Sequence, residues 1–433
     1  MDCQESLGQR LRDLRLRRGI SQAQLAFPEL SDSYVSLIES GKRIPAPSVI
    51  ELLARKLGCS ASYLASGVSD ETVTELHMTL KYGELSLENG EVEEARASFA
   101  KILNHPSLSA LPDLMYEVRW GFARALEAGG DLENAVAELE NLVNLISPEE
   151  DPDRWAWLHL ALCRCYRERG EFSAGVSVGE DGLRRLSEVQ THWTESTVML
   201  GVTLLGVFLE RGDLFYANQL AKRLIARAED VGSARARAAA YWNAGVLAEY
   251  RGDIDEGLRL GERALALLGE SDDTRNLARL RTQYGRLMLR ARPDQAERAR
   301  DLIQQARHAL ADSAASEIDE VSCAMELAKA EIALGRPAEA VKLAKEAIEL
   351  IGNDRRFLAA EVLIVLANGY VGLDKIDTAV EALRQAAETL EGMQSQRKAA
   401  QTWFDLAELL GRAGDEKQRA EAYRHACACA GLG

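Results

Sequence analysis

The stretch Gly130-Asp131-Leu132-Glu133-Asn134-Ala135 decides the fold, because its pattern recurs along most of the 433-residue chain. A glycine followed by an acidic residue ends one amphipathic helix, and a second helix that opens with a small residue follows. The same turn occurs at Gly90-Glu91, Gly170-Glu171, Gly212-Asp213, Gly252-Asp253 and Gly414-Asp415, with variants at Arg292-Pro293-Asp294, Gly335-Arg336-Pro337 and Leu373-Asp374. The pattern predicts a helical hairpin that is repeated many times.

The repeats have a nearly fixed period of 39 to 42 residues over nine units. The small residues that open the second helices are Ala95, Ala135, Gly175, Ala217, Gly257, Ala299, Ala340, Ala379 and Ala420. Further small residues mark crossing points on the first helices, at Gly83, Ala123, Cys163, Gly245, Ala328, Ala367 and Ala407. Such a period predicts an α-solenoid of about nine helical pairs.

Composition supports an all-α protein in a reducing compartment. Aromatic residues make up 6% of the chain, prolines number nine, and β-branched residues do not alternate over strand length. The seven cysteines are scattered, as expected for the cytoplasm. The longest apolar run, residues 198–209, is too short to span a bilayer, and residues 1–9 lack a signal-peptide pattern, so we expect no membrane association.

Charge is divided unevenly along the chain. The net charge is −16, yet residues 1–67 carry +2 and the remainder carries −18. An acidic body repels phosphate, so we expect any contact with nucleic acid to be confined to the N-terminal head.

The sequence of the head predicts five short helices. Leucines 7, 11, 14 and 16 lie on helical spacing, and Gly19 ends that helix. Ser21 and Ser31 are predicted to cap helices over 22–27 and 32–40, the second with Val35 and Ile38 facing inward. Two further helices are expected over 47–57 and from residue 60.

Two segments carry a resemblance to a known family. They are Ser21-Gln22-Ala23-Gln24-Leu25-Ala26 and Ser31-Asp32-Ser33-Tyr34-Val35-Ser36-Leu37-Ile38-Glu39-Ser40-Gly41-Lys42-Arg43-Ile44-Pro45, and together they resemble the XRE family of repressor-like helix-turn-helix domains. The resemblance implies that the second helix of the motif enters the major groove, while flanking residues hold phosphates. The implied DNA-binding residues are Gln22, Asp32, Ser33, Tyr34, Ser36, Leu37, Lys42 and Arg43.

The body resembles the tetratricopeptide repeat, with Phe99 four residues after Ala95, although its period exceeds 34 residues; HEAT-like packing is the alternative. We assign residues 1–67 to the DNA-binding domain, 68–72 to a linker, and 73–433 to a right-handed repeat domain. A capping box formed by Thr72 and Glu75 is expected to start the first helix of the body.

The first helices of such repeats line an inner wall that can receive a ligand. Counting along each repeat places eight candidates there: Trp120, Arg124, Trp157, Arg164, Arg167, Trp242, Asn243 and Arg286. Arginine can hold a carboxylate, asparagine a peptide backbone, and tryptophan an apolar group. A purely structural role is the simpler alternative for each of them, as core tryptophan or solvated arginine.

The whole chain resembles the RRNPP peptide-sensing regulators and related actinobacterial regulators. This implies a homodimer on a pseudo-palindromic operator, gated by a peptide or small-molecule effector, without a cofactor or metal. The alternative is a scaffold that captures a protein partner while the head localises it to DNA. An enzyme is disfavoured. The string Gly175-Val176-Ser177-Val178-Gly179 falls on a predicted helix rather than on the strained turn that this hydrolase motif needs. The string Ser98-Phe99-Ala100-Lys101 also falls on a predicted helix, and the partner motifs of its chemistry are absent.

Overall fold

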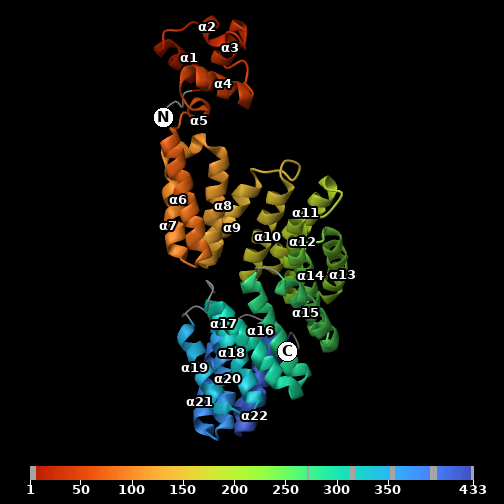
Figure 1. The fold of residues 1–433 in the computed structure, drawn as a ribbon. Coiled ribbons are helices and arrows are strands. Elements are labelled where there is room, and N and C mark those ends of the chain that lie inside the picture. The colour runs from red at the N-terminus through yellow and green to blue at the C-terminus, as the bar shows by residue number, and fades with distance from the viewer. Residues whose placement is uncertain (1–5, 271–272, 312–316, 352–355, 391–396, 431–433) are drawn as a thin grey trace. The chain divides into compact units, whose positions relative to one another are not determined.

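The computed structural model describes residues 6–430 apart from 271–272, 312–316, 352–355 and 391–396. Every regular element in these ranges is a helix, and no strand occurs within them (Figure 1). The prediction of an all-α protein is therefore confirmed. The chain divides into two compact units, residues 1–142 and 143–433.

The described ranges also bear on the sequence expectations about membrane helices, metal sites, cysteines and buried glycines. No helix there combines the length and apolar character needed to cross a bilayer. No group of three or more His, Cys, Asp or Glu side chains in these ranges is arranged to hold a metal ion. Six cysteines are free thiols, and Cys3 lies outside the described residues. Gly175 and Gly179 are buried inside a helix.

The head contains the five expected helices. They are α1 (Leu7–Arg17), α2 (Gln22–Ala26), α3 (Asp32–Glu39), α4 (Pro47–Leu57) and α5 (Ala61–Ser66). The hydroxyls of Ser21 and Ser31 accept hydrogen bonds from the backbone at the starts of α2 and α3, as predicted. Leu16 does not join the inner face of α1, because Arg15 takes the inward position and Leu16 is exposed.

The first helix of the body begins three residues earlier than the sequence indicates, at Asp70 rather than residue 73. The first four body helices are α6 (Asp70–Glu88), α7 (Val92–Leu103), α8 (Pro112–Ala128) and α9 (Leu132–Val143), with a 3-10 helix, η1 (Pro106–Ala110), before α8. The predicted linker over 68–72 and the capping box at Thr72 are wrong, because Ser69 caps α6 by accepting a hydrogen bond from the Thr72 N–H at 3.2 Å. Only Val68 and Ser69 separate Gly67, the C-cap of α5, from α6.

The described residues of the second unit form seven helical pairs. Their helices are α10 (Pro152–Glu168), α11 (Phe172–Val189), α12 (Glu195–Arg211), α13 (Leu214–Val231), α14 (Ala234–Tyr250), α15 (Ile254–Gly269), α16 (Thr274–Ala291), α17 (Ala296–Ala311), α18 (Glu317–Ala333), α19 (Pro337–Leu350), α20 (Arg356–Gly372), α21 (Ile376–Leu390), α22 (Arg397–Ala413) and α23 (Glu416–Cys429), with η2 (Pro293–Gln295) before α17. Together with α6–α9 they make the nine predicted pairs.

The turns inside the pairs explain why glycine recurs there. Gly130, for example, has a φ of 79°, a left-handed conformation that residues with a side chain rarely adopt. In the variant turn Leu373-Asp374, Asp374 takes this role with a φ of 57°. Aspartate is among the few residues that tolerate such a backbone.

The small residues at the helix crossings are buried as predicted, except in the last pair. Ala420 is exposed, so the prediction that it packs at the crossing is wrong. Arg419 holds that position instead, and a Cβ at Gly411 of α22 would lie 2.9 Å from its Nε atom. The glycine on the first helix thus makes room for a large residue on the second.

A fully buried phenylalanine joins three helices of the first unit. Phe99 on α7 lies against Gly83 of α6 and Gly121 of α8. A Cβ built at Gly83 would lie 2.9 Å from the ring, and one at Gly121 would lie 2.6 Å from it. Real Cβ atoms do not approach a ring so closely, so both glycines are required by packing.

We expect Gly121→Ala to loosen this unit. The added methyl group overpacks the Phe99 ring and should destabilise α6–α8 by about 1–3 kcal/mol. Hydrogen exchange at the amides of α6–α8 measures the local change. Gly269→Ala on α15 is the control, because a Cβ there meets no neighbour within 4 Å, and it should leave exchange unchanged or slower. Equal protection in the two variants would contradict the packing role.

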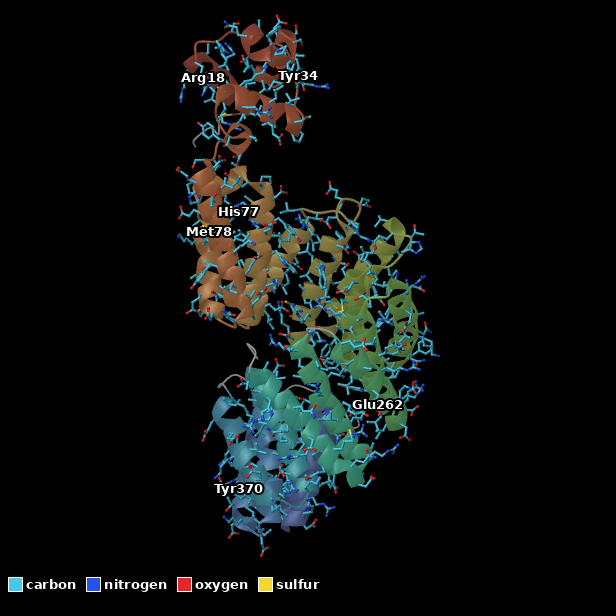
Figure 2. All side chains as sticks on the ribbon, viewed as in Figure 1. Arg18, Tyr34, His77, Met78, Glu262 and Tyr370 are labelled. Atoms are coloured by element: carbon cyan, nitrogen blue, oxygen red, sulfur yellow. The ribbon has the colours of Figure 1, made fainter. Side chains whose placement is uncertain are left out.

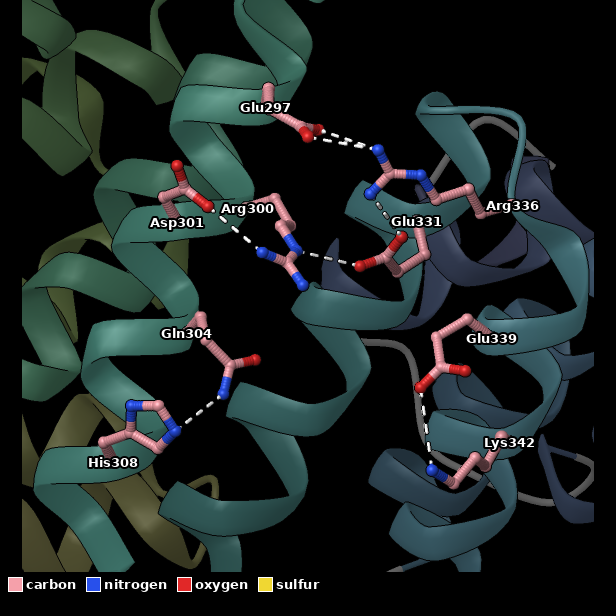
Figure 3. Close-up of polar contacts among 9 residues, drawn as sticks. All are labelled: Glu297, Arg300, Asp301, Gln304, His308, Glu331, Arg336, Glu339 and Lys342. Atoms are coloured by element: carbon pink, nitrogen blue, oxygen red, sulfur yellow. Dashed lines mark hydrogen bonds and ion pairs between the residues drawn. The ribbon is translucent and has the colours of Figure 1, made fainter.

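Ion pairs join successive helices of the second unit. Glu331 on α18 is buried and accepts from Arg300 of α17 at 3.0 Å, and it also pairs with Arg336 at 3.5 Å (Figure 3). Arg336 reaches Glu297 of α17 as well, at 3.1 Å. The carboxylate of Glu331 thus connects α17, α18 and the turn before α19.

Candidate nucleic-acid interface

Helix α3 has one buried and one exposed face. Val35 and Ile38 are buried in the core of the head, whereas Ser33, Ser36 and Leu37 are exposed. The Ser31 hydroxyl accepts from the Tyr34 N–H at 3.1 Å and starts the helix. Ser33, Ser36 and Leu37 therefore lie on the outer side of the helix, and Asp32 lies at its start. All four are predicted DNA-binding residues.

Tyr34 and Asp32, two of the predicted DNA-binding residues, each form contacts within the head. Tyr34 is half-buried and packs against the head core (Figure 2). The Asp32 carboxylate accepts from the Ser33 N–H at 2.8 Å and lies in the first turn of α3. A carboxylate in this position stabilises the helix start through the helix dipole.

A buried polar network fixes α3 against α1 and α2. Arg15 Nε donates to Glu39 Oε1 at 2.6 Å, and Arg15 Nη2 donates to Glu39 Oε2 at 3.0 Å. The Gln22 amide donates to the same Oε2 atom at 2.7 Å, and Arg15 Nη1 donates to the Ile20 carbonyl at 2.9 Å. The Arg15 and Glu39 side chains are only 10% and 5% exposed.

The network determines the charge of Glu39. Burial alone would raise its pKa, but the hydrogen bonds from Arg15 and Gln22 outweigh burial and lower the pKa. Glu39 therefore stays ionised and holds Arg15 by a two-point contact, which fixes orientation better than a single contact. Gln22 is part of this network, and its proposed phosphate contact remains a prediction.

Lys42 and Arg43 follow the end of α3. Their backbone N–H groups donate to the Leu37 carbonyl at 2.9 and 3.2 Å, which positions the segment. Both side chains are exposed, and neither forms an ion pair with another described residue. Two such cations beside the exposed face of α3 suit contact with phosphate.

A lysine that the sequence reasoning missed holds the turn between α2 and α3. Lys56 of α4 donates to the carbonyls of Leu25 and Phe27 at 3.0 and 2.6 Å, and it pairs with Glu29 at 2.6 Å. These carbonyls end α2, where a cation is favourable. Lys56 thereby fixes the turn that precedes the exposed helix.

The predicted ligand residues of the body lie in both units. Trp120 is half-buried and Arg124 exposed, both on α8 of the first unit. In the second unit, Trp157 and Trp242 pack against apolar cores, and the Asn243 amide donates to the Ala239 carbonyl of its own helix. These three side chains thus form contacts within the repeats, and their role in ligand binding stays a prediction.

The predicted arginines of the second unit take part in charged contacts. Arg164 on α10 is half-buried. Arg167 lies 3.9 Å from Glu210 of α12, and Arg286 of α16 donates to Glu249 of α14 at 2.6 Å. First helices of neighbouring pairs are thus connected through their charged side chains.

Comparison with known proteins places the head in a defined class. Residues 6–66 match the family model of a helix-turn-helix domain. Over 59 residues, 13% of this chain and 54% of the relative, the sequence is 39% identical to the competence pilus inhibition repressor of Acinetobacter baylyi. The chain thus spans about half the length of this curated relative. The head is a helix-turn-helix domain, which confirms the resemblance of its motif residues.

The repeat fold is shared with solved structures at low sequence identity. A Rap protein in complex with competence and sporulation factor has a TM-score of 0.54 and 13% identity, over 83% of this chain and 98% of that one. The apo form of RapI has a TM-score of 0.51 and 13% identity, over 82% and 97%. The predicted tetratricopeptide-like solenoid fold of the body is therefore confirmed.

Proposed function

We propose that the chain is a sequence-specific DNA-binding transcription regulator whose repeat body binds an effector, most simply a peptide. One observation carries the DNA-binding part: α3 presents Ser33, Ser36 and Leu37 to solvent while the Glu39 network holds its other side. A rigid helix with an exposed polar face can enter the major groove and contact base edges. The match of residues 6–66 to a helix-turn-helix domain supports this role for α3.

The proposal extends to a homodimer on a pseudo-palindromic operator. Helix-turn-helix heads read one half-site each, so two copies place two heads about 34 Å apart along the duplex, or a multiple of that distance. The net charge of −18 beyond residue 67 directs phosphate contact to the heads. We place the protein in the cytoplasm, without a cofactor and without catalytic activity.

Effector binding regulates DNA binding through the body in this proposal. An effector that prefers one arrangement of the repeats shifts the population toward it, and this changes whether both heads reach their half-sites. The Rap protein of similar fold was solved with competence and sporulation factor bound, which favours a ligand-binding role for the repeats. Genomic footprinting, with and without cell extract, would identify the operator and show whether an effector alters occupancy.

We expect the double variant Lys42→Ala, Arg43→Ala to weaken binding to every duplex alike. Each lost phosphate contact lowers the slope of log K against log salt by about 0.9, so the slope should fall by about 2. Fluorescence anisotropy on operator and random duplexes at about 50 to 300 mM salt measures this slope. Lys81→Ala with Lys101→Ala, on α6 and α7, makes the same change in net charge and should keep the slope. An unchanged slope in the head variant would remove both residues from the interface.

A further inference from the structure

Leu37 is an exposed apolar side chain on the polar face of α3. It lies one residue after Ser36, four residues after Ser33 and three residues before Ser40, so the four side chains share one face of the helix. All four are exposed, Leu37 by 42%. The structure describes every residue from 32 to 40, and Leu37 is the one apolar side chain among them that is exposed. The outer face of α3 thus combines hydroxyl groups with a single isobutyl group.

The side chain of Leu37 does not take part in folding the head. Helix α3 contributes Val35 and Ile38 to the apolar core, and Leu37 lies on the other side of the helix. The backbone carbonyl of Leu37 accepts from the Ser40 hydroxyl at 3.1 Å, a contact that any residue at this position could make. The isobutyl group is therefore free to contact a partner molecule.

The other exposed side chains of α3 have little base selectivity. In the major groove, guanine is held by arginine or lysine and adenine by asparagine or glutamine. None of these four residue types occurs in residues 32–40. A serine hydroxyl can both donate and accept, so it can contact any base. Discrimination between bases is therefore left to Leu37 and to Asp32, the acidic residue in the first turn of α3.

The buried side of α3 fixes the direction in which Leu37 points. Val35 and Ile38 are buried, and Arg15 donates to both carboxylate oxygens of Glu39, at 2.6 and 3.0 Å. These contacts prevent the helix from turning about its axis. Leu37 is thus held on the outer face before any contact with DNA, which lowers the entropy cost of binding.

We propose that Leu37 contacts the 5-methyl group of a thymine, so that one thymine in each half-site determines operator choice. This proposal rests on the proposed function of the head as a sequence-specific DNA-binding domain. The thymine methyl is the apolar group that base pairs present in the major groove, and contact with an isobutyl group removes both from water. Any other base would place hydrogen-bonding groups against Leu37, where they lose water and gain no partner.

The test uses the full-length protein and a pool of random duplexes, and the most enriched duplex becomes the probe. Each thymine of the probe is replaced in turn by deoxyuridine, which removes the methyl group and keeps the hydrogen-bonding groups of the base. Fluorescence anisotropy measures the affinity of each duplex. At one thymine of each half-site, the replacement should weaken wild-type binding about four-fold, which corresponds to about 0.8 kcal/mol for one methyl-sized group removed from water.

A matched pair of variants assigns this effect to one side chain. Leu37→Ser removes the isobutyl group and should bind the thymine and deoxyuridine duplexes alike. Leu16→Ser is the control, because Leu16 lies on α1, is 55% exposed and loses the same group, and it should keep the four-fold difference. Each ratio compares two duplexes on one protein, so a change in the folded fraction cancels.

The outcomes separate this proposal from the proposed function. The Leu37 contact is overturned if no thymine of the probe is sensitive to deoxyuridine, or if Leu16→Ser loses the difference as Leu37→Ser does. It is also overturned if Leu37→Ser keeps the wild-type difference, since another exposed side chain, such as Ile44, would then contact the methyl group. These outcomes leave sequence-specific binding standing. If no duplex is enriched over the random pool, the proposed DNA-binding function fails, and the Leu37 contact fails with it.

Discussion

Glu39→Gln is expected to abolish specific operator binding and to destabilise the head by about 3 kcal/mol, the cost of breaking a buried ion pair on one side. The substitution keeps the shape of the side chain but removes its charge. Arg15, which is 10% exposed, then loses its ionic partner, and the Gln22 amide loses a charged acceptor. Because this network holds α3 against α1 and α2, the exposed face of α3 should lose its fixed orientation.

The measurements are hydrogen exchange across α1–α3 and anisotropy titration of the footprinted operator, both on the full chain. Glu29→Gln is the matched control, since it removes a carboxylate of the same head that pairs with Lys56 at 2.6 Å but is about half exposed. Exposed pairs contribute little, so exchange and operator affinity should stay close to wild type. If the two variants behaved alike, the Glu39 network would not be what orients α3.

Acid should have a related effect on the wild-type head. The folded-state pKa of Glu39 lies below its usual value, so the ion pair contributes stability above the unfolded pKa, and this contribution is lost as the pH falls through the folded pKa. Glu39→Gln removes the titrating group. The variant should therefore lose less stability than wild type between neutral pH and pH values below about 4, the usual range of a glutamate.

Local signals in the sequence predicted the helices but not the contacts between them. Helix starts at Ser21 and Ser31 follow from hydroxyls that reach backbone N–H groups within three residues, and such short-range chemistry is readable from sequence. The sequence places the start of the first body helix three residues too late, because Ser69 and Thr72 are both good caps and only the fold selects Ser69. The crossing residue of the last pair is predicted wrongly for a similar reason. Arg419 and Ala420 are neighbours in the sequence, the repeat pattern favours the small residue, and the fold places Arg419 at the crossing.

The Glu39 network was missed because its partners are far apart in the sequence. Arg15 and Glu39 are separated by 24 residues. One signal was available: Arg15 lies four residues after the buried Leu11, and an inward-facing arginine needs a buried partner. Glu39, on the α3 side that also carries Val35, is such a partner. Counting along the repeats likewise placed Arg286 correctly on a first helix but could not show that Glu249 already binds it.

Glu331→Ala is expected to lower the free energy of unfolding of the second unit. Removing one side of a buried ion pair costs about 3–5 kcal/mol, and we expect a value near the lower end of this range. The carboxylate is buried and receives Arg300 and Arg336, so its loss leaves two guanidiniums without their shared partner (Figure 3). The cost falls toward the lower end because both arginines are partly exposed, and water and Glu297 compensate them. Hydrogen exchange at the amides of α17–α19 and urea unfolding measure the change.

Glu339→Ala provides the control for this effect in the same region. Its carboxylate lies 3.7 Å from Lys342 on the surface of α19, so removing it should leave exchange and unfolding unchanged. Salt sharpens the comparison: 1 M NaCl, where screening acts within about 3 Å, should weaken exposed pairs and affect the buried Glu331 carboxylate less. The difference between Glu331→Ala and wild type should therefore persist at high salt. A difference that disappears in 1 M NaCl would mean that Glu331 acts as a surface charge and not as the buried connection between α17, α18 and the turn before α19.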